Sequence, residues 1–408
     1  MASIGYCLRQ QQLLLLKVNH FSFLQHHSEI ICKYIIYIII IINPAMAFKA
    51  IFQSSYPWTK APLIASAPML NIAMPRLAVS VSEAGGLGFL AAGFDVSNLS
   101  QNLEESTRLV LGSKNPHVQQ SFAKGGILPI GVGFINWGAD LRKSMAALQD
   151  HRPCAVWFFA PRSQPDDLLP WVENVRAVTH GQTKVWVQVG TVAEAVVVAE
   201  TLRPDVLVVQ GSDAGGHGLA RSASVLTLVP EVRDALQGCH ANQASRDGLP
   251  AILAAGGIVD GRGMAASLAL GSSGAVMGTR FLASQEATVA RGYQAEVLRA
   301  SDGGRSTVRS TVYDRVRDIG GWPDRYDGRG VINESYIDAV ERGLGDEENK
   351  RLYQEELKKG DSGWGPTGRL TTYAGTGVGL VKETLSAATI VERVRSEAND
   401  IIHNLADT

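Results

Sequence analysis

Short apolar segments that alternate regularly with amphipathic ones predict an α/β protein folded as a (β/α)8 TIM barrel. The apolar segments lack the polar alternation of half-exposed strands, which favours parallel strands buried on both faces. Eight strand-and-helix units fit within residues 61–282, close to the roughly 250 residues of a typical barrel. A doubly wound open sheet is the competing topology, because counting strands and helices does not separate the two.

The predicted elements follow one another in a fixed order. The eight strands are predicted at residues 63–69, 87–91, 127–132, 155–159, 185–189, 206–209, 251–255 and 275–277. Helices are predicted between them, most clearly over residues 167–178, 192–202, 229–236 and 263–270.

The pattern changes after the eighth strand. Residues 301–370 are rich in charge, glycine and aromatic side chains, Trp322 among them, and predict a small helical insertion or lid. Residues 384–402 then predict a closing amphipathic helix. The expected organisation is a barrel over 46–300, the insertion over 301–370, and a C-terminal segment over 371–408 that returns to the barrel.

The composition of the chain indicates which partners to expect and in which cellular compartment the protein lies. The chain has 408 residues, a net charge of -1, 45% hydrophobic and 19% charged residues. This balance gives no electrostatic reason to expect nucleic acid or a stable membrane partner. The four cysteines lie far apart without a CxxC spacing, which favours reduced thiols in a cytoplasmic protein. They are Cys7, Cys32, Cys154 and Cys239.

The first 45 residues differ from the rest of the chain. Residues 30–42 form an apolar run that contains Lys33, shorter than the roughly 20 residues that span a membrane. Residues 44–47 are a poor signal-peptidase site. We therefore expect a non-native extension with Met46 as the true start, and the alternative is a weak membrane or organelle anchor.

Unusual residues gather where the predicted strands end. In a barrel, these C-terminal ends meet at one rim, where active sites form. The rim groups are Ala67-Pro68-Met69, Gly131-Val132-Gly133, Gln188, the stretch from Gln210 to Gly218, Gly256-Gly257 and Gly278-Thr279.

The glycine turns after the seventh and eighth strands predict an anion site. Bare backbone N–H groups, together with a helix that begins near Asp260, suit a phosphate, and barrels most often hold phosphate at these two loops. No GxGxxG opens the first unit, since residues 85–88 precede a strand. A mononucleotide such as FMN, or a phosphorylated substrate, is therefore expected rather than a dinucleotide.

His217 is the candidate catalytic residue. It follows the glycine pair Gly215-Gly216 at the rim, and the ordinary imidazole pKa of about 6.5 suits proton transfer near neutral pH. Asp213 lies four residues earlier, but no third ligand is evident, so no metal is expected.

These motifs resemble the nitronate monooxygenase family. The resemblance rests on QGSDAGGHG at 210–218, AAGGI at 254–258, MGTRF at 277–281, Ala67-Pro68-Met69, and YAGTG at 373–377. It covers residues 61–398 and implies a metal-free FMN enzyme that oxidises nitronates with O2 to a carbonyl compound and nitrite. It also implies that His217 acts as a base or as an anchor for the anionic substrate. In its protonated form His217 would pair with a nitronate, and in its neutral form it would take the α-proton of a nitroalkane.

The expected site residues follow from the rim position and the resemblance together. The substrate pocket is predicted to include Met69, His217 and Tyr373. The FMN site is predicted to include Ala67, Pro68, Met69, Gly133, Gln188, Gln210, Gly215, Gly216, Gly256, Gly257, Val276, Met277, Gly278 and Thr279.

One departure from the family leaves the substrate open. Many members carry asparagine where this chain has Gly133, so a flavin contact is missing or supplied by Gln188. The alternatives are an FMN-dependent enoyl-thioester reductase that consumes NAD(P)H, a tailoring oxidase of a larger metabolite, and a flavin- or phosphate-binding module without turnover.

Overall fold

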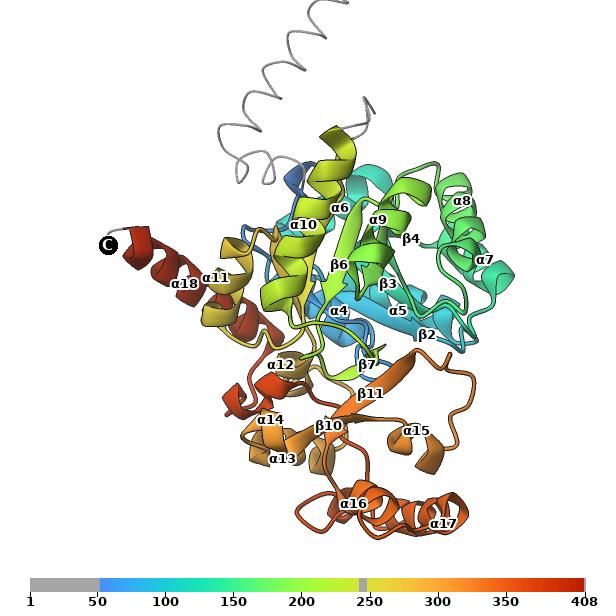
Figure 1. Ribbon diagram of the computed structural model, residues 1–408. Helices are drawn as coiled ribbons and strands as arrows, with labels where there is room; N and C mark the ends of the chain where they lie inside the picture. Colours follow the sequence, from blue (N-terminus) through green and yellow to red (C-terminus); the bar gives the residue numbers. More distant parts are fainter. Residues whose placement is uncertain (1–51, 242–247, 407–408) are drawn as a thin grey trace, which may run out of the picture. The chain divides into compact units, whose positions relative to one another are not determined.

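The computed structural model describes residues 52–241 and 248–406 (Figure 1). Contacts divide the chain into Met1–Ile51 and Phe52–Thr408, and every described residue belongs to the second unit. The predicted extension over 1–45 and the start at Met46 lie outside the described residues.

Eight parallel strands form the central sheet of the described residues, in the order β1-β9-β8-β6-β5-β4-β3-β2. The two ends of this order meet, because Leu87 N donates to Ile64 O and Ser66 N donates to Leu87 O. The sheet therefore closes on itself and the predicted barrel is confirmed. The strands are β1 Leu63–Ser66, β2 Phe89–Gly93, β3 Ile127–Ile135, β4 Arg152–Phe159, β5 Lys184–Val189, β6 Val206–Gln210, β8 Ala251–Ala255 and β9 Gly274–Met277.

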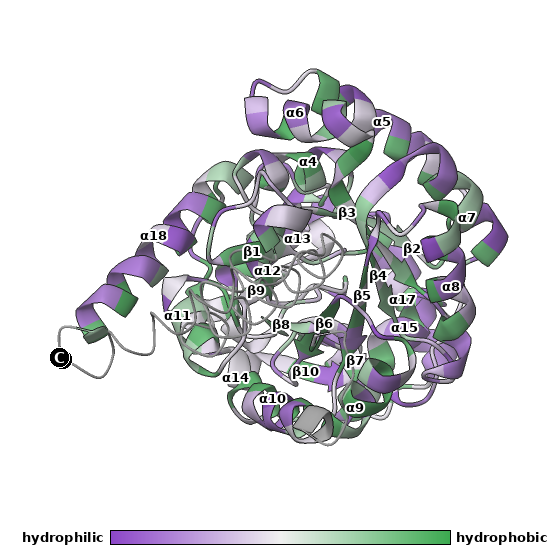
Figure 2. Cartoon of the chain, turned by 90° about the horizontal axis from the view of Figure 1, so that it is seen from above, coloured by the Kyte–Doolittle hydropathy of each residue, from purple (hydrophilic) through white to green (hydrophobic). Residues whose placement is uncertain are grey.

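Helices surround the barrel, as Figure 2 shows in a view turned by 90°. The final helix, α18 Ala387–Ala406, packs against both α11 and α4. It therefore completes the ring of helices, as the predicted closing helix. The other surrounding helices are α4 Pro75–Glu83, α5 Leu99–Leu111, α6 Pro116–Gly125, α7 Leu141–Asp150, η1 Asp166–Leu168, α8 Leu169–Val178, α9 Val192–Thr201, α10 Val225–Ala241 and α11 Gly261–Ala269.

The N-terminal end of the barrel is filled by aromatic side chains. Phe89 packs 4.8 Å from Trp186 and 5.2 Å from Trp157, measured between ring centroids. Tyr56 precedes the first strand, and its hydroxyl accepts a hydrogen bond of 2.8 Å from Trp186 Nε1. Burial raises the pKa of Tyr56 well above its ordinary value. This packed interior leaves the opposite end of the barrel for a site.

The segment after β9 contains more than the predicted helices. Strand β11 Tyr326–Val331 pairs antiparallel with both β10 Thr307–Ser310 and β7 Gly216–Leu219, in the order β10-β11-β7. The sequence did not predict this sheet, because β7 contains two glycines and strand propensity alone does not favour it. The remaining elements are α12 Thr279–Leu282, α13 Arg291–Arg299, α14 Gly303–Ser306, α15 Val312–Val316, α16 Glu334–Val340, α17 Asp346–Leu357, η2 Gly360–Gly363 and η3 Thr376–Leu380.

The position of this second sheet is the main consequence of the fold for function. Figure 1 shows β7, β10 and β11 together at one end of the barrel, with α15, α16 and α17 beyond them. The domain boundaries at residues 300 and 370 stay predictions, since residues 301–370 pair directly with β7 of the barrel segment.

Candidate active site

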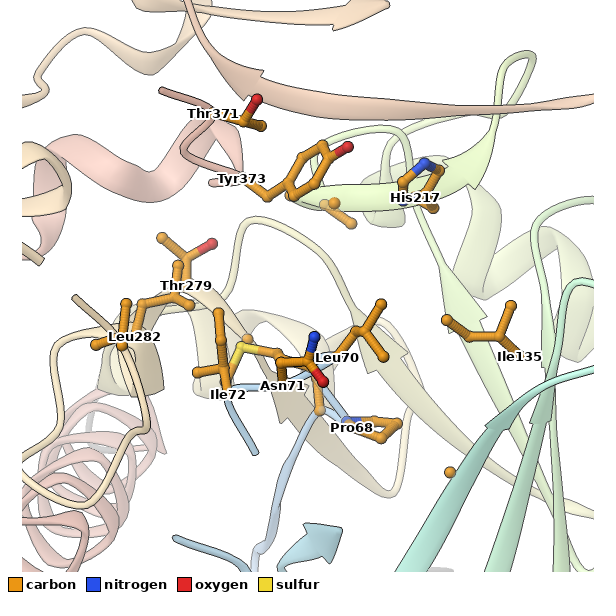
Figure 3. Close-up of a pocket in the computed structure, with 18 of the residues that line it drawn as sticks. Pro68, Leu70, Asn71, Ile72, Ile135, His217, Thr279, Leu282, Thr371 and Tyr373 are labelled. Atoms are coloured by element: carbon orange, nitrogen blue, oxygen red, sulfur yellow. The ribbon is translucent and has the colours of Figure 1, made fainter. Parts of the chain in front are cut away.

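A cavity of about 580 Å³ lies at the C-terminal ends of the barrel strands. Figure 3 shows its floor around Pro68, its wall at Thr279 and Leu282, and Tyr373 and His217 on the opposite side. All but one of the predicted site residues line this cavity. They are Ala67, Pro68, Met69, Gly133, Gln188, Gln210, Gly215, Gly216, His217, Gly256, Gly257, Val276, Gly278, Thr279 and Tyr373.

Met277 is the predicted site residue that does not line the cavity. Its side chain is fully buried, and its carbonyl accepts a 3.0 Å hydrogen bond from Ala67 N. This bond ties the end of β9 to the loop after β1. The contribution of Met277 at this position is to hold the first rim loop in place.

The two glycine turns present unpaired backbone donors to the cavity. Gly256 and Gly257 have φ values of +111° and +74°, which favour glycine. The N–H groups of Gly257 and Gly278 donate no hydrogen bond to any residue that the structure describes. Two turns of this kind, side by side at the ends of β8 and β9, can bind the oxygens of a phosphate.

The N-terminus of α11 is not free to bind a phosphate, contrary to the prediction from the sequence. Asp260 accepts hydrogen bonds from the N–H groups of Arg262 and Gly263, and Glu397 accepts one from Gly261 N. The first turn of this helix is therefore already capped by protein carboxylates. Any phosphate has to be held by the turns themselves rather than by this helix end.

The glycine pair before His217 has two different explanations. A Cβ on Gly215 would lie 2.3 Å from Gly375 N, so close packing of the segment after Tyr373 requires glycine there. Gly216 has a φ of +70°, and a Cβ added to it would meet no protein atom within 4 Å. Since Gly216 lines the cavity, that space is part of the site.

Gln188 and Gln210 differ in whether their side-chain amide nitrogen is free to donate a hydrogen bond to a ligand. Gln188 Oε1 accepts a 3.2 Å hydrogen bond from Trp157 Nε1, so the Gln188 amide nitrogen remains available to donate into the cavity. Gln210 Nε2 instead donates to the carbonyl of His217 at 3.2 Å. Gln210 therefore fixes the backbone of β7, and Gln188 offers a donor to a ligand.

Gly133 is required by its neighbour across the barrel mouth. A Cβ at this position would lie 2.3 Å from Cβ of Pro68. A larger side chain such as asparagine would not fit here without displacing Pro68. The glycine in β3 and the proline after β1 therefore form a matched pair.

His217 lies on strand β7 rather than on a loop. Its Nε2 lies 3.0 and 2.9 Å from the two carboxylate oxygens of Asp314, and the hydroxyl of Tyr373 donates to Asp314 at 3.0 Å. The indole of Trp322 stacks on the imidazole, with ring centroids 3.7 Å apart and an interplanar angle of 3°. The imidazole is therefore held on one edge and over one face.

The second sheet brings these groups together. His217 pairs with Gly328 across β7 and β11, and Gly330 of β11 bridges to Tyr373. The insertion supplies Asp314 and Trp322, from α15 and from the segment before β11. Trp322 belongs to the aromatic group that predicted a lid, whereas no sequence signal singled out Asp314.

Arg317 supplies the permanent positive charge of the cavity. It is the only Lys, Arg, Asp or Glu that lines the cavity in the described part of the chain, and no carboxylate there pairs with it. Burial lowers the pKa of Arg317, but its interactions with Tyr373 and Tyr353 raise it overall. The guanidinium carbon lies 5.5 Å from the centroid of the Tyr373 ring.

Tyr373 stays protonated across the physiological range. Burial, and then the charge of Asp314, raise its pKa well above the ordinary value, although Arg317 opposes this. The phenol therefore remains a hydrogen-bond donor to Asp314. The cavity as a whole combines a cation, a held imidazole and apolar walls, which suits a small anionic substrate.

These residues fit a bound flavin that carries a phosphate. The free N–H groups of Gly257 and Gly278 suit a phosphate, the Gln188 amide suits a ring carbonyl, and the space beside Gly216 leaves room for a planar ring. No cluster of three or more His, Cys, Asp or Glu that could hold a metal occurs among the described residues. Within the same residues, no helix has the length and apolar character to cross a bilayer.

Comparison with known proteins identifies the family. Residues 167–396 match the family model described as nitronate monooxygenase. The nitronate monooxygenase npaC of Metarhizium robertsii is 47% identical over 356 residues, covering 87% of this chain and 96% of that protein. The chain belongs to the nitronate monooxygenase family. A nitronate monooxygenase of Neurospora crassa is 35% identical, covering 88% of this chain and 95% of that protein.

Solved structures support the fold of this nitronate monooxygenase family member. The nitroalkane oxidase from Streptomyces ansochromogenes superposes with a TM-score of 0.63 at 23% identity, covering 86% of this chain and 99% of that one. FabK from Thermotoga maritima gives a TM-score of 0.63 at 23% identity, covering 87% and 98%. At this identity the likeness establishes the barrel fold, while the family assignment rests on the closer relatives.

Proposed function

We propose that this chain binds FMN at the mouth of the barrel and oxidises alkyl nitronates with O2 to a carbonyl compound and nitrite. The observation that carries the proposal is the cavity itself, because His217 and Arg317 line the same cavity as the free backbone donors of the two glycine turns. Membership in the nitronate monooxygenase family supports the same reaction.

The phosphate of FMN would be held by the turns that contain Gly257 and Gly278. Pro68, Gly216 and the free amide of Gln188 are the residues that would contact the ring. When bound, the flavin supplies electron transfer from the nitronate to O2. The protein has to bind the substrate next to it, orient it and keep competing water away.

Arg317 and His217 are the groups that would hold the substrate. The nitronate is an anion, and Arg317 is a cation without a carboxylate partner that lines the same cavity. A charged hydrogen bond of this kind is worth about 1.5–3 kcal/mol. The stacked Trp322 and the apolar wall at Ile72 and Leu282 would limit water around the reacting carbon.

The test is a purified preparation assayed for flavin and for nitrite. We expect a yellow protein that releases FMN rather than FAD on denaturation, and that produces nitrite from ethyl nitronate under air without NAD(P)H. A colourless protein that added FMN does not reconstitute would refute the cofactor assignment. Substrate-dependent NAD(P)H oxidation without nitrite release would instead indicate a reductase.

A further inference from the structure

The partner of His217 determines which of its nitrogens is free. Asp314 Oδ1 and Oδ2 both lie within 3.0 Å of Nε2. Nδ1 makes no hydrogen bond within the described part of the chain, and it is not among the fully buried polar atoms there that lack a partner. Since His217 lines the cavity, Nδ1 is the nitrogen left for a ligand.

The Asp314 carboxylate has few polar partners besides His217. The residue is only 7% exposed, and in the described chain its ion pair is with His217 alone. The Tyr373 hydroxyl donates to Oδ1. A buried carboxylate accepts hydrogen bonds only, so it strongly favours an Nε2–H group facing it.

From this geometry we propose that Asp314 is a positioning residue that keeps the proton of neutral His217 on Nε2, so that the Nδ1 lone pair is available as a base for neutral nitroalkanes. The inference rests on the proposed function, and it adds the residue that sets the tautomer of His217. Trp322, stacked on the ring face, opposes rotation of the imidazole away from Asp314.

The proton transfer balances within the site. The bond between the α-carbon and its hydrogen breaks, the proton moves to Nδ1, and the electron pair remains on the substrate as the nitronate. His217 becomes an imidazolium whose Nε2–H still faces Asp314, so the new positive charge is formed next to a carboxylate. The nitronate then lies beside this imidazolium and Arg317. A nitronate supplied directly has already lost this proton and needs no base.

That difference provides a test with two substrates. In Asp314→Asn, the amide can present either its oxygen or its NH2 group to Nε2, so the tautomer is no longer fixed. We expect kcat/KM for nitroethane to fall by about 10²-fold or more, the usual scale for loss of a general base. For ethyl nitronate we expect a loss below about tenfold, because no proton is abstracted.

Two further variants separate positioning from a structural role. Asp314→Glu retains a carboxylate and should recover at least about tenfold of the nitroethane activity that Asp314→Asn loses. Asp338→Asn removes another buried carboxylate of the insertion, one that pairs with Arg369 and Arg342 and does not line the cavity. In this control the ratio of the two activities should stay at the wild-type value.

Equal losses on both substrates in Asp314→Asn, or no loss, would overturn the inference. So would a wild-type enzyme that oxidises ethyl nitronate but not nitroethane. A wild-type enzyme that oxidises neither would refute the proposed function instead.

A spectroscopic measurement stays informative even if Asp314→Asn does not fold. In holoenzyme labelled with ¹⁵N-histidine, with His217→Asn used for assignment, we expect neutral His217 to show a protonated Nε2 and an unprotonated Nδ1. The opposite tautomer would overturn the inference whatever the activities are.

Discussion

Replacing Gly216 by alanine tests whether this position requires glycine for its backbone conformation alone or also to leave space for a ligand. Gly216 has a φ of +70°, and a Cβ there would meet no protein atom within 4 Å. Gly343 is a matched control, because its φ is +69° and its Cβ would also meet nothing within 4 Å. Gly216 lines the cavity, whereas Gly343 is exposed between α16 and α17.

The two substitutions should cost the same free energy of unfolding. An L-residue in the left-handed region costs about 1–2 kcal/mol, and the reduced freedom of the unfolded chain returns about 0.4–1 kcal/mol. The net loss of about 1 kcal/mol should lower the Tm of either variant by only about 1 °C, because the unfolding entropy of a chain of 408 residues is large. Thermal denaturation of the flavin-free proteins measures this part.

Flavin binding should respond to Gly216→Ala alone. A methyl group placed in a fitted site costs about 1–3 kcal/mol, which corresponds to a roughly 5- to 150-fold higher Kd for FMN. Quenching of flavin fluorescence during titration of the apoprotein measures this Kd. If both variants bind FMN with the wild-type Kd, Gly216 serves only the backbone of β7, and the placement of the ring beside it is wrong.

Four other substitutions test the remaining parts of the site and its support. His217→Asn should keep the flavin spectrum while nitroalkane turnover falls by at least about 10²-fold, and undiminished turnover would remove His217 from the reaction. Arg317→Met should raise KM for ethyl nitronate about tenfold or more by removing one charged hydrogen bond, with unchanged flavin content in the absorbance spectrum; an unchanged KM would contradict its substrate role. Gly133→Ala places a Cβ 2.3 Å from Cβ of Pro68 and should lower the free energy of unfolding, measured by urea denaturation, by about 1–3 kcal/mol. An unchanged free energy of unfolding would show that the loop after β1 moves to accommodate the methyl group. Burial raises the pKa of Asp338, but hydrogen bonds from its two arginine partners lower this pKa overall. The stabilisation from Asp338 is therefore complete above its pKa in the unfolded chain, near 3.8, and is lost as the pH falls through its lower pKa in the folded protein. Asp338→Asn should therefore cost about 1.5–3 kcal/mol at pH 7 and progressively less in acid, and a cost independent of pH would be inconsistent with the ion pair.

The barrel, and the end at which its site lies, could be predicted from the sequence, although closure of the sheet could not be separated there from a doubly wound topology. Local patterns carry this information, because each buried parallel strand is a short apolar run and each is followed by its own helix. The glycine turns at Gly257 and Gly278 and the position of His217 were predicted from the same local order, and all three line the cavity.

The tertiary structure decided what surrounds His217. Asp314 lies 97 residues away along the chain, in a segment that the sequence identified only as a lid with helical character. Strand β7 contains Gly216 and Gly218 and forms because β11 pairs with it, so its own residues do not reveal it. The same holds for the capped end of α11, where Glu397 arrives from the last helix. Local sequence encodes which elements form, but contacts between distant segments depend on how those elements pack, and here such contacts determine which atom of His217 meets the substrate.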